Sequence, residues 1–195
     1  ARNWARIAPG LMAAVLSRIT LLSAQDAQSE ARFLALGLPA ARLGPRLMLK
    51  TRPATHAPRP FTPPHPRARI LLAASTHPGE EAPILRAFAQ VRGATFDLLI
   101  LAPRHPRRNA EVAATIRATG LTFATRSAGE VPGRDTAVYL ADTLGEMAGW
   151  YAMAGATLIG GTFAPVGGHT PYEPAAHGSA ILHGPGVANF TESFA

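Results

Sequence analysis

The sequence contains no cysteine, which excludes a disulfide-stapled scaffold, a cysteine-ligated zinc site and a thiol nucleophile. Charged residues are also scarce, at 16% of 195 residues against 47% apolar residues, and this balance excludes a disordered chain. The longest apolar run, residues 11–22, is interrupted by Arg18 and is too short to span a bilayer. What remains is a globular chain long enough for one domain or one and a half.

Lysine is almost absent, because Lys50 is the single lysine among 19 basic residues. The net charge of +7 favours anionic partners such as nucleic acid, a phosphorylated substrate or an acidic membrane face. A GC-rich coding sequence, indicated by the abundant Ala, Gly and Pro, explains the arginine excess without any function. The arginines are scattered, with no basic helix and no interleaved aromatics, so the pattern does not favour nucleic acid.

The first third of the chain predicts a few local elements and then a proline-rich stretch. The expected elements are an amphipathic helix over 1–18, a short strand over 19–24, a helix over 25–36 and extended chain over 42–50. Six prolines then fall between Pro53 and Pro66, a density that no packed element tolerates. We therefore assign residues 51–67 to a linker or a long surface loop.

After this stretch, strands and helices alternate regularly. The expected strands are 69–74, 96–102, 121–124, 137–140, 157–159 and 180–182, and the expected helices are 80–91, 107–119, 144–153 and 172–177. The continuous apolar run FDLLILA is typical of a strand that is buried on both faces. This alternation predicts an α/β fold, a Rossmann-like doubly wound parallel sheet with helices on both sides.

Polar and glycine-rich residues collect directly after the expected strands. They are Thr76 and His77, residues 103–107, residues 142–147 and residues 160–170. In doubly wound sheets, ligands bind just beyond the carboxyl ends of the strands. We interpret these segments as the rim of a binding site.

The segment PRHPRR, residues 103–108, places Arg104 between a proline-bracketed turn and an expected helix start. A guanidinium there can form a forked contact with a phosphate, and the helix N-terminus adds partial positive charge. A basic first turn is otherwise unfavourable for a helix, so this mismatch predicts an anion at that point.

The segment DTLGEM, residues 142–147, places Gly145 at the opening of an expected helix, where backbone N–H groups can approach a phosphate or a sugar. The same six residues also fit a helix cap. Asp142 or Thr143 would be the N-cap, and Glu146 would complete a capping box. On these residues alone, the capping interpretation is favoured.

The segment GGTFAPVGGHTPYEP, residues 160–174, has two glycine pairs and leads into an expected helix. Glu173 in the first turn of that helix could accept hydrogen bonds from ribose hydroxyls, or merely complement the helix dipole. The loop is neither GxGxxG nor a Walker A sequence. His169 alone is more often a structural group than a catalyst, and the seven histidines lack metal-ligand spacing.

Together these motifs resemble the Kdo transferases, the 3-deoxy-D-manno-octulosonic acid transferases of lipopolysaccharide assembly. The matching segments are THPGEE (76–81), LLILAPRHPRR (98–108), DTLGEM (142–147), GGTFAPVGGHTPYEPAAHG (160–178) and GPGVANF (184–190), with AQDAQSEARFLALG (24–37) ahead of them. The resemblance implies a two-domain glycosyltransferase of the GT-B type, inverting and independent of metals and cofactors. It would transfer Kdo from CMP-Kdo to a lipid A precursor at the cytoplasmic face of the bacterial inner membrane.

The resemblance also divides the chain. Residues 1–50 would be a remnant of the N-terminal acceptor domain, 51–67 the linker, and 68–195 a C-terminally incomplete CMP-sugar-binding domain. The acceptor half, with a glutamate general base and any peripheral or anchored contact to an anionic membrane surface, would lie outside this chain. We therefore expect these 195 residues to bind nucleotide but to be inactive alone.

The family's sites carry over onto matching positions. Expected CMP contacts are Pro103, Arg104, Leu144, Gly145, Glu146, Thr170, Pro171, Tyr172 and Glu173; expected donor-sugar contacts are Thr76, His77, Gly168 and His169. Lys50 would stabilise charge on the leaving group. The family usually has Asn at Thr170, Leu at Tyr172 and an acidic residue at Pro78, and of its Gly-Asn-Leu-Lys-Phe segment only Leu49 and Lys50 remain.

Three alternatives stay open at this stage. One is a GT-B transferase or epimerase that uses another nucleotide sugar, which nucleotide preference would distinguish. Another is a non-catalytic nucleotide-binding module. A third, a nucleic-acid-binding domain, rests on the net charge alone and predicts steep salt dependence of DNA binding.

Overall fold

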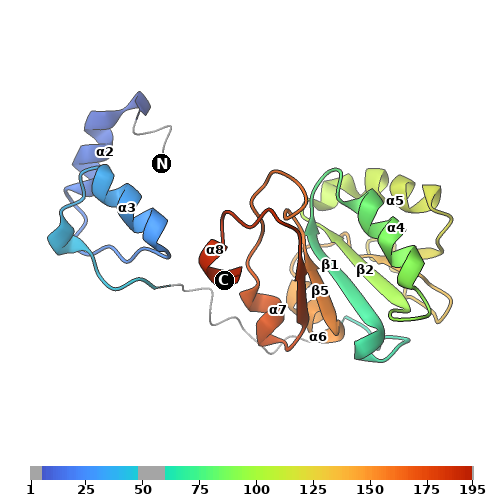
Figure 1. Ribbon diagram of the computed structural model, residues 1–195. Coiled ribbons are helices and arrows are strands. Elements are labelled where there is room, and N and C mark those ends of the chain that lie inside the picture. The colour runs from blue at the N-terminus through green and yellow to red at the C-terminus, as the bar shows by residue number, and fades with distance from the viewer. Residues whose placement is uncertain (1–5, 48–59, 195) are drawn as a thin grey trace. The chain divides into compact units, whose positions relative to one another are not determined.

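The computed structural model describes residues 6–47 and 60–194 (Figure 1). The chain divides into two compact units at the boundary between Thr51 and Arg52. Within the described residues, no helix has the length and apolar character needed to cross a membrane.

The described part of the first unit includes two short α-helices and a single turn of 3-10 helix. These elements are α2 (Pro9–Leu16), α3 (Ala27–Ala35) and η1 (Ala40–Arg42). Pro9 opens α2, in keeping with the preference of proline for the first turn of a helix. Asp26 caps α3 by accepting a hydrogen bond from the Ser29 N–H at 2.6 Å.

The expected strand over 19–24 is wrong, because this segment forms only an isolated parallel bridge between Leu22 and Leu43. The hydrogen bonds then leave the ladder register, because the N–H of Leu47 and not that of Arg46 donates to the Ala24 carbonyl oxygen, at 2.9 Å. The expected helix over 1–18 is also too long, since α2 ends at Leu16 and residues 1–5 lie outside the described residues.

The second unit is built on a six-stranded, all-parallel sheet with the order β3-β4-β2-β1-β5-β6. Its strands are β1 (Ile70–Thr76), β2 (Leu98–Pro103), β3 (Phe123–Thr125), β4 (Val138–Leu140), β5 (Ala156–Ile159) and β6 (Ala180–His183). The predicted Rossmann-like α/β fold is confirmed. Strands β1 and β2 lie at the centre, which explains their almost unbroken apolar sequence.

Helices cover both faces of this sheet, as Figure 1 shows for α4 and α5 on one side and α6 on the other. The helices are α4 (Glu81–Val91), η4 (Pro106–Arg108), α5 (Asn109–Ala118), α6 (Met147–Met153), α7 (Tyr172–Ala176) and α8 (Thr191–Phe194), with η3 (Arg67–Arg69) before β1. Side chains of β1 alternate between the two cores. Leu71 packs with α4 and α5, whereas Ile70 and Leu72 pack with Trp150 of α6.

The described part of the proline-rich stretch, residues 60–66, contains bends but no helix or strand. It is nevertheless packed, because the ring of Phe61 lies 5.0 Å from that of Tyr139 and 5.9 Å from that of Trp150. Aromatic pairs at these separations add to the stability of a core. This stretch therefore contributes a side chain to the second core.

The strand order reverses between β1 and β5. From β1 the chain builds outward through β2, with β3 and β4 on the same side, and then crosses to β5 on the other side of β1. In open α/β sheets, such a switch point leaves a crevice at the carboxyl ends of the two strands, and ligands bind there. The fold therefore predicts a ligand site at the carboxyl ends of β1 and β5.

Candidate functional site

The ends of β1 and β5 meet at very close range. Ser75, in a register shift between Ala74 and Thr76, adopts a positive φ of 58°. A Cβ atom on Gly160 would lie 2.4 Å from the Ser75 carbonyl oxygen, so only glycine fits after β5. The two loops that leave these strands are therefore held side by side by the backbone itself.

Glu80 is the polar hub of this switch point, and it was missed by the sequence analysis. Its carboxylate, in a side chain that is buried, accepts hydrogen bonds from four backbone N–H groups. The donors are His77 at 2.8 Å, Gly161 at 2.8 Å, Phe163 at 2.9 Å and Ala164 at 3.2 Å. The only available signal was the pair of adjacent acidic residues in THPGEE, in a chain with just 12 acidic residues.

Replacing Glu80 with Gln is expected to lower the free energy of unfolding by about 1–3 kcal/mol. Glutamine keeps one acceptor oxygen but presents an NH₂ group to backbone N–H donors, which leaves buried donors unsatisfied. Urea denaturation measures this change. The matched control is Glu130→Gln, because Glu130 is an exposed carboxylate that accepts a hydrogen bond from the backbone N–H of Thr125. A Glu80→Gln protein as stable as wild type would contradict this role.

Thr76, His77, Pro103 and Arg104 are brought together at the ends of β1 and β2. Pro103 is the register partner of Thr76, and the Arg104 N–H donates to the Thr76 carbonyl oxygen at 2.9 Å. The Arg104 side chain is exposed on this edge. The two expected segments are therefore adjacent, but Thr76 and Pro103 are buried, so only His77 and Arg104 reach the surface here.

The argument that the basic turn before α5 needs an external anion is wrong for Arg108. Its guanidinium contacts the buried carboxylate of Glu81 at 2.8 and 3.2 Å, and it also pairs with Glu111 at 2.7 Å. These hydrogen bonds raise the pKa of Arg108 and lower the pKa of the Glu111 carboxyl. The chain itself thus supplies the anions for Arg108, whereas Arg104 and Arg107 are exposed.

His77 and His169 meet directly across the switch point. Their Nε2 atoms are 2.9 Å apart, and their ring centroids are 5.1 Å apart. His105 lies beside them, with its ring centroid 6.3 Å from that of His77. Burial, together with the nearby charges of His105 and Arg104, lowers the pKa of His77 despite the opposing effect of Glu80.

The loop that carries Gly168 and His169 is fixed by the segment after β6. The Gly168 N–H donates to the Gly161 carbonyl oxygen at 2.8 Å, and the Asn189 side-chain amide donates to the Val166 carbonyl oxygen at 2.9 Å. A Cβ atom on Gly167, which has a φ of +90°, would lie 2.8 Å from that Asn189 amide. The motif GPGVANF therefore acts as a support for the glycine-rich loop.

The capping interpretation of DTLGEM is wrong. Helix α6 begins only at Met147 and its N-cap, Glu146, makes no side-chain capping bond. Asp142 instead accepts hydrogen bonds from Ser127, at 2.9 Å from the N–H and 2.6 Å from the hydroxyl. Glu146 pairs with Arg126 at 2.6 and 3.0 Å, which lowers the pKa of the Glu146 carboxyl.

These contacts leave mainly the backbone of the loop after β4 to contact a ligand. Because the Glu146 carboxylate is occupied by Arg126, the groups left to meet a ligand are the backbone around Gly145 and the exposed side chain of Leu144. Gly145 adopts a φ of 84°, a conformation that glycine reaches without strain. In the sheet, β2 lies between β1 and β4, the strand that this loop follows.

The last group of expected contacts surrounds the start of α7. Pro171 is the N-cap residue and Tyr172 the first helical residue, while the Thr170 hydroxyl accepts from the Tyr172 N–H at 3.4 Å. Glu173 is exposed in the first turn. Burial of the Tyr151 hydroxyl, together with the nearby Glu173 carboxylate, raises the pKa of Tyr151.

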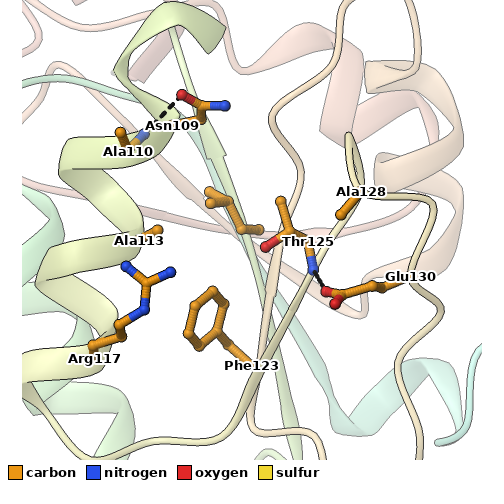
Figure 2. A pocket seen from close by; sticks show the side chains of 9 residues that line it. Asn109, Ala110, Ala113, Arg117, Phe123, Thr125, Ala128 and Glu130 are labelled. Atoms are coloured by element: carbon orange, nitrogen blue, oxygen red, sulfur yellow. Dashed lines mark hydrogen bonds between the residues drawn. The ribbon is translucent and has the colours of Figure 1, made fainter.

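A cleft of about 370 Å³ lies elsewhere, between α5 and the ends of β3 and β4 (Figure 2). It is lined by Asn109, Ala110, Ala113, Arg117, Phe123, Thr125, Ala128, Glu130 and Leu140. The Arg117 guanidinium stands 5.3 Å from the centroid of the Phe123 ring, so this charge already covers an aromatic face. No expected site residue lines this cleft. We therefore place the candidate site at the switch point and not in this cleft.

Two further observations concern ligand types. Among residues 6–47 and 60–194, no group of three or more His, Asp or Glu side chains is placed to hold a metal ion. Lys50, the expected electrostatic catalyst, lies outside the described residues, so its role stays a prediction.

A six-stranded parallel sheet with a switch point between β1 and β5 defines this unit as a Rossmann-like α/β domain. No protein-family model matches the chain. Curated relatives do: the chain is 42% identical over 129 residues to the 3-deoxy-D-manno-octulosonic acid transferase of Bordetella pertussis, across 64% of this chain and 30% of the relative. With the enzyme of the same name from Haemophilus influenzae it shares 32% identity over 194 residues, across 91% of this chain and 43% of the relative.

A solved structure agrees with these relatives. The C-terminal CMP-Kdo binding domain of WaaA from Acinetobacter baumannii superposes with a TM-score of 0.61 and 35% sequence identity, covering 65% of this chain and 66% of that domain. The chain is thus a homologue of the Kdo transferases, a glycosyltransferase family, and the homology includes their C-terminal donor domain. It spans less than half the length of these two curated relatives.

Proposed function

We propose that the carboxyl edge of this sheet binds CMP-Kdo as the sugar donor of a Kdo transferase of the GT-B type. The observation that carries the proposal is the likeness, in sequence and in fold, to a solved CMP-Kdo binding domain. The geometry supports it, because the segments that expose His77 and Arg104 lie side by side next to the switch point. The acceptor would be a lipid A precursor, and the reaction would take place at the cytoplasmic face of the bacterial inner membrane.

In this proposal, transfer is a direct, inverting displacement at the anomeric carbon of Kdo, with CMP as the leaving group. The residues at the edge stabilise the charge that develops on the departing phosphate, through the Arg104 guanidinium and backbone N–H groups around Gly145 and the start of α7. Fixed donors of this kind need no metal ion or cofactor. A general base that deprotonates the acceptor hydroxyl would come from the acceptor-binding part of the enzyme.

The nine expected CMP contacts divide by chemistry. Arg104, Pro103 and the backbone around Leu144 and Gly145 would face the phosphate, and Glu173 the ribose hydroxyls. Thr170 and Tyr172 replace the family's usual Asn and Leu, so a hydroxyl takes the place of an amide at one contact. Glu146 would act through its ion pair with Arg126, which holds the loop in place.

Replacing Arg104 with Ala is expected to weaken CMP binding by roughly tenfold or more, since a charged hydrogen bond to phosphate contributes about 1.5–3 kcal/mol. Isothermal titration of CMP into wild type and variant measures this change. Arg134→Ala is the matched control, because Arg134 is another exposed arginine that precedes β4 at the opposite edge of the sheet. Equal affinities of wild type and Arg104→Ala for CMP would refute the assignment.

The same titration distinguishes the proposed donor from another nucleotide sugar. A Kdo transferase is expected to prefer CMP over UMP and GMP, because only the base pocket differs among these ligands. A preference for UMP or GMP would instead favour a GT-B transferase or epimerase with a different donor.

A further inference from the structure

The strongest unexplained feature of the switch point is the direct contact between two imidazole rings. His77 follows β1 and His169 lies in the loop after β5, 92 residues further along the chain. A centroid separation of 5.1 Å with the Nε2 atoms 2.9 Å apart and an angle of 14° between the planes places the rings edge to edge. This is the geometry of an in-plane hydrogen bond, in which one Nε2–H donates to the other Nε2.

Burial and the charged groups around His77 favour its neutral form. Glu80 of the β1–α4 turn favours a proton on His77, whereas burial and the nearby Arg104, His105 and Arg108 oppose it. The Glu80 carboxylate already accepts four backbone N–H groups, so it cannot take a further donor without losing one. Arg108 in turn is paired with Glu81 and Glu111.

A hydrogen-bonded imidazole pair responds to a proton in a specific way. In the neutral pair, the accepting ring carries its hydrogen on Nδ1, and the donating ring carries its hydrogen on Nε2. An added proton goes to the Nδ1 of the donating ring, and the Nε2–H···Nε2 bond is kept. The pair then carries one positive charge, which favours an anionic oxygen beside it.

We propose that His77 and His169 form a proton-coupled anion site, which takes up one proton when an anionic oxygen of the donor binds in the crevice between β1 and β5. The inference rests on the proposed function and names the chemistry that the crevice recognises, a phosphate or a sugar carboxylate. Binding of the anion favours the charged pair, so the pKa of the pair is higher in the complex than in the free protein.

The sign of the pH dependence follows from this difference. Between the pKa of the free pair and that of the bound pair, the complex holds more protons than the free protein, so affinity falls as the pH rises. For uptake of one proton, the loss reaches about tenfold per pH unit. Outside that interval, the affinity does not depend on this pair.

The test is isothermal titration between pH 6 and 8 in buffers with different ionisation enthalpies, which reports the protons taken up on binding. The probes are CMP-Kdo, cytidine 5′-methylphosphate and free Kdo, none of which titrates in this interval. Proton uptake on binding of cytidine 5′-methylphosphate assigns the site to the phosphate. Uptake with CMP-Kdo or free Kdo, but not with the methylphosphate, assigns it to the sugar carboxylate. Either pattern supports the proposal.

Variants separate proton uptake from a merely structural hydrogen bond. His77→Gln and His169→Gln retain hydrogen-bonding groups but cannot be protonated, so both are expected to bind CMP-Kdo without uptake and without the pH slope. His183→Gln, a change of the same type at the end of β6, is expected to behave as wild type. Wild-type binding of CMP-Kdo without proton uptake, or uptake that persists in both Gln variants, would overturn the inference. Absence of any binding by wild type would overturn the proposed function as well.

Discussion

Replacing Arg108 with Met is expected to lower the free energy of unfolding by about 3–5 kcal/mol, because it leaves a buried carboxylate without its cation. The side chain of Glu81 is only 4% exposed and that of Arg108 only 10%. Besides the two contacts from Arg108, Glu81 accepts a hydrogen bond from the Thr76 hydroxyl at 2.9 Å. The lost pair therefore lies next to the end of β1, where the proposed donor binds.

Urea denaturation of wild type and variant measures this loss. Arg107→Met is the matched control, because Arg107 is the exposed neighbour in the same turn, and it is expected to change stability by no more than about 0.5 kcal/mol. The double variant Arg108→Met, Glu81→Met removes both charges and is expected to recover part of the loss. If Arg108→Met and Arg107→Met are equally stable, the buried pair does not have this role.

Replacing Lys50 with Ala is expected to reduce Kdo transfer by about 10²–10³-fold, the usual cost of removing one donor to a developing negative charge. The argument comes from the sequence. Lys50 is the one lysine in a chain whose other 18 basic residues are arginines, and the resemblance to Kdo transferases places at this position the lysine that stabilises the leaving group. Because arginine is used at every other basic position of this chain, the lysine at position 50 favours a functional role for Lys50.

The measurement is transfer of Kdo from CMP-Kdo to a lipid A precursor, in a transfer-competent form of the protein. Lys50→Arg is expected to restore only part of the rate, because a planar fork does not replace a compact point charge. Arg46→Ala, which removes a nearby half-exposed partner of Glu30, is the control and is expected to leave the rate unchanged. Near wild-type turnover by Lys50→Ala would refute the role of this lysine.

Much of the fold follows from local sequence pattern. The apolar run over 96–102 predicts a strand buried on both faces, and β2 spans Leu98–Pro103 at the centre of the sheet. Helix α4 spans Glu81–Val91 against a predicted 80–91. Such elements are predictable because burial of a continuous run or of one helix face is decided by residues close together in the chain. The strand expected over 19–24 is wrong because strand pairing depends on a partner segment, and here the pairing with the segment around Leu43 is limited to one bridge.

The sequence by itself also determined that ligand-type residues follow the strands, because a parallel sheet collects all of its strand ends at one edge. It did not determine which polar groups satisfy one another. Glu146 fits a capping box within six residues, but the folded chain offers it Arg126, which forms a charged, two-point contact from another loop.

Only the tertiary structure decided the chemistry at the switch point. Glu80 accepts from backbone N–H groups 81–84 residues away, and backbone donors leave no mark in the sequence. His77 and His169 are each unremarkable alone, and they become a hydrogen-bonded pair because β1 and β5 are neighbours in the sheet. Local pattern records what each residue can do, whereas the partner that it meets depends on which distant strand the sheet places beside it.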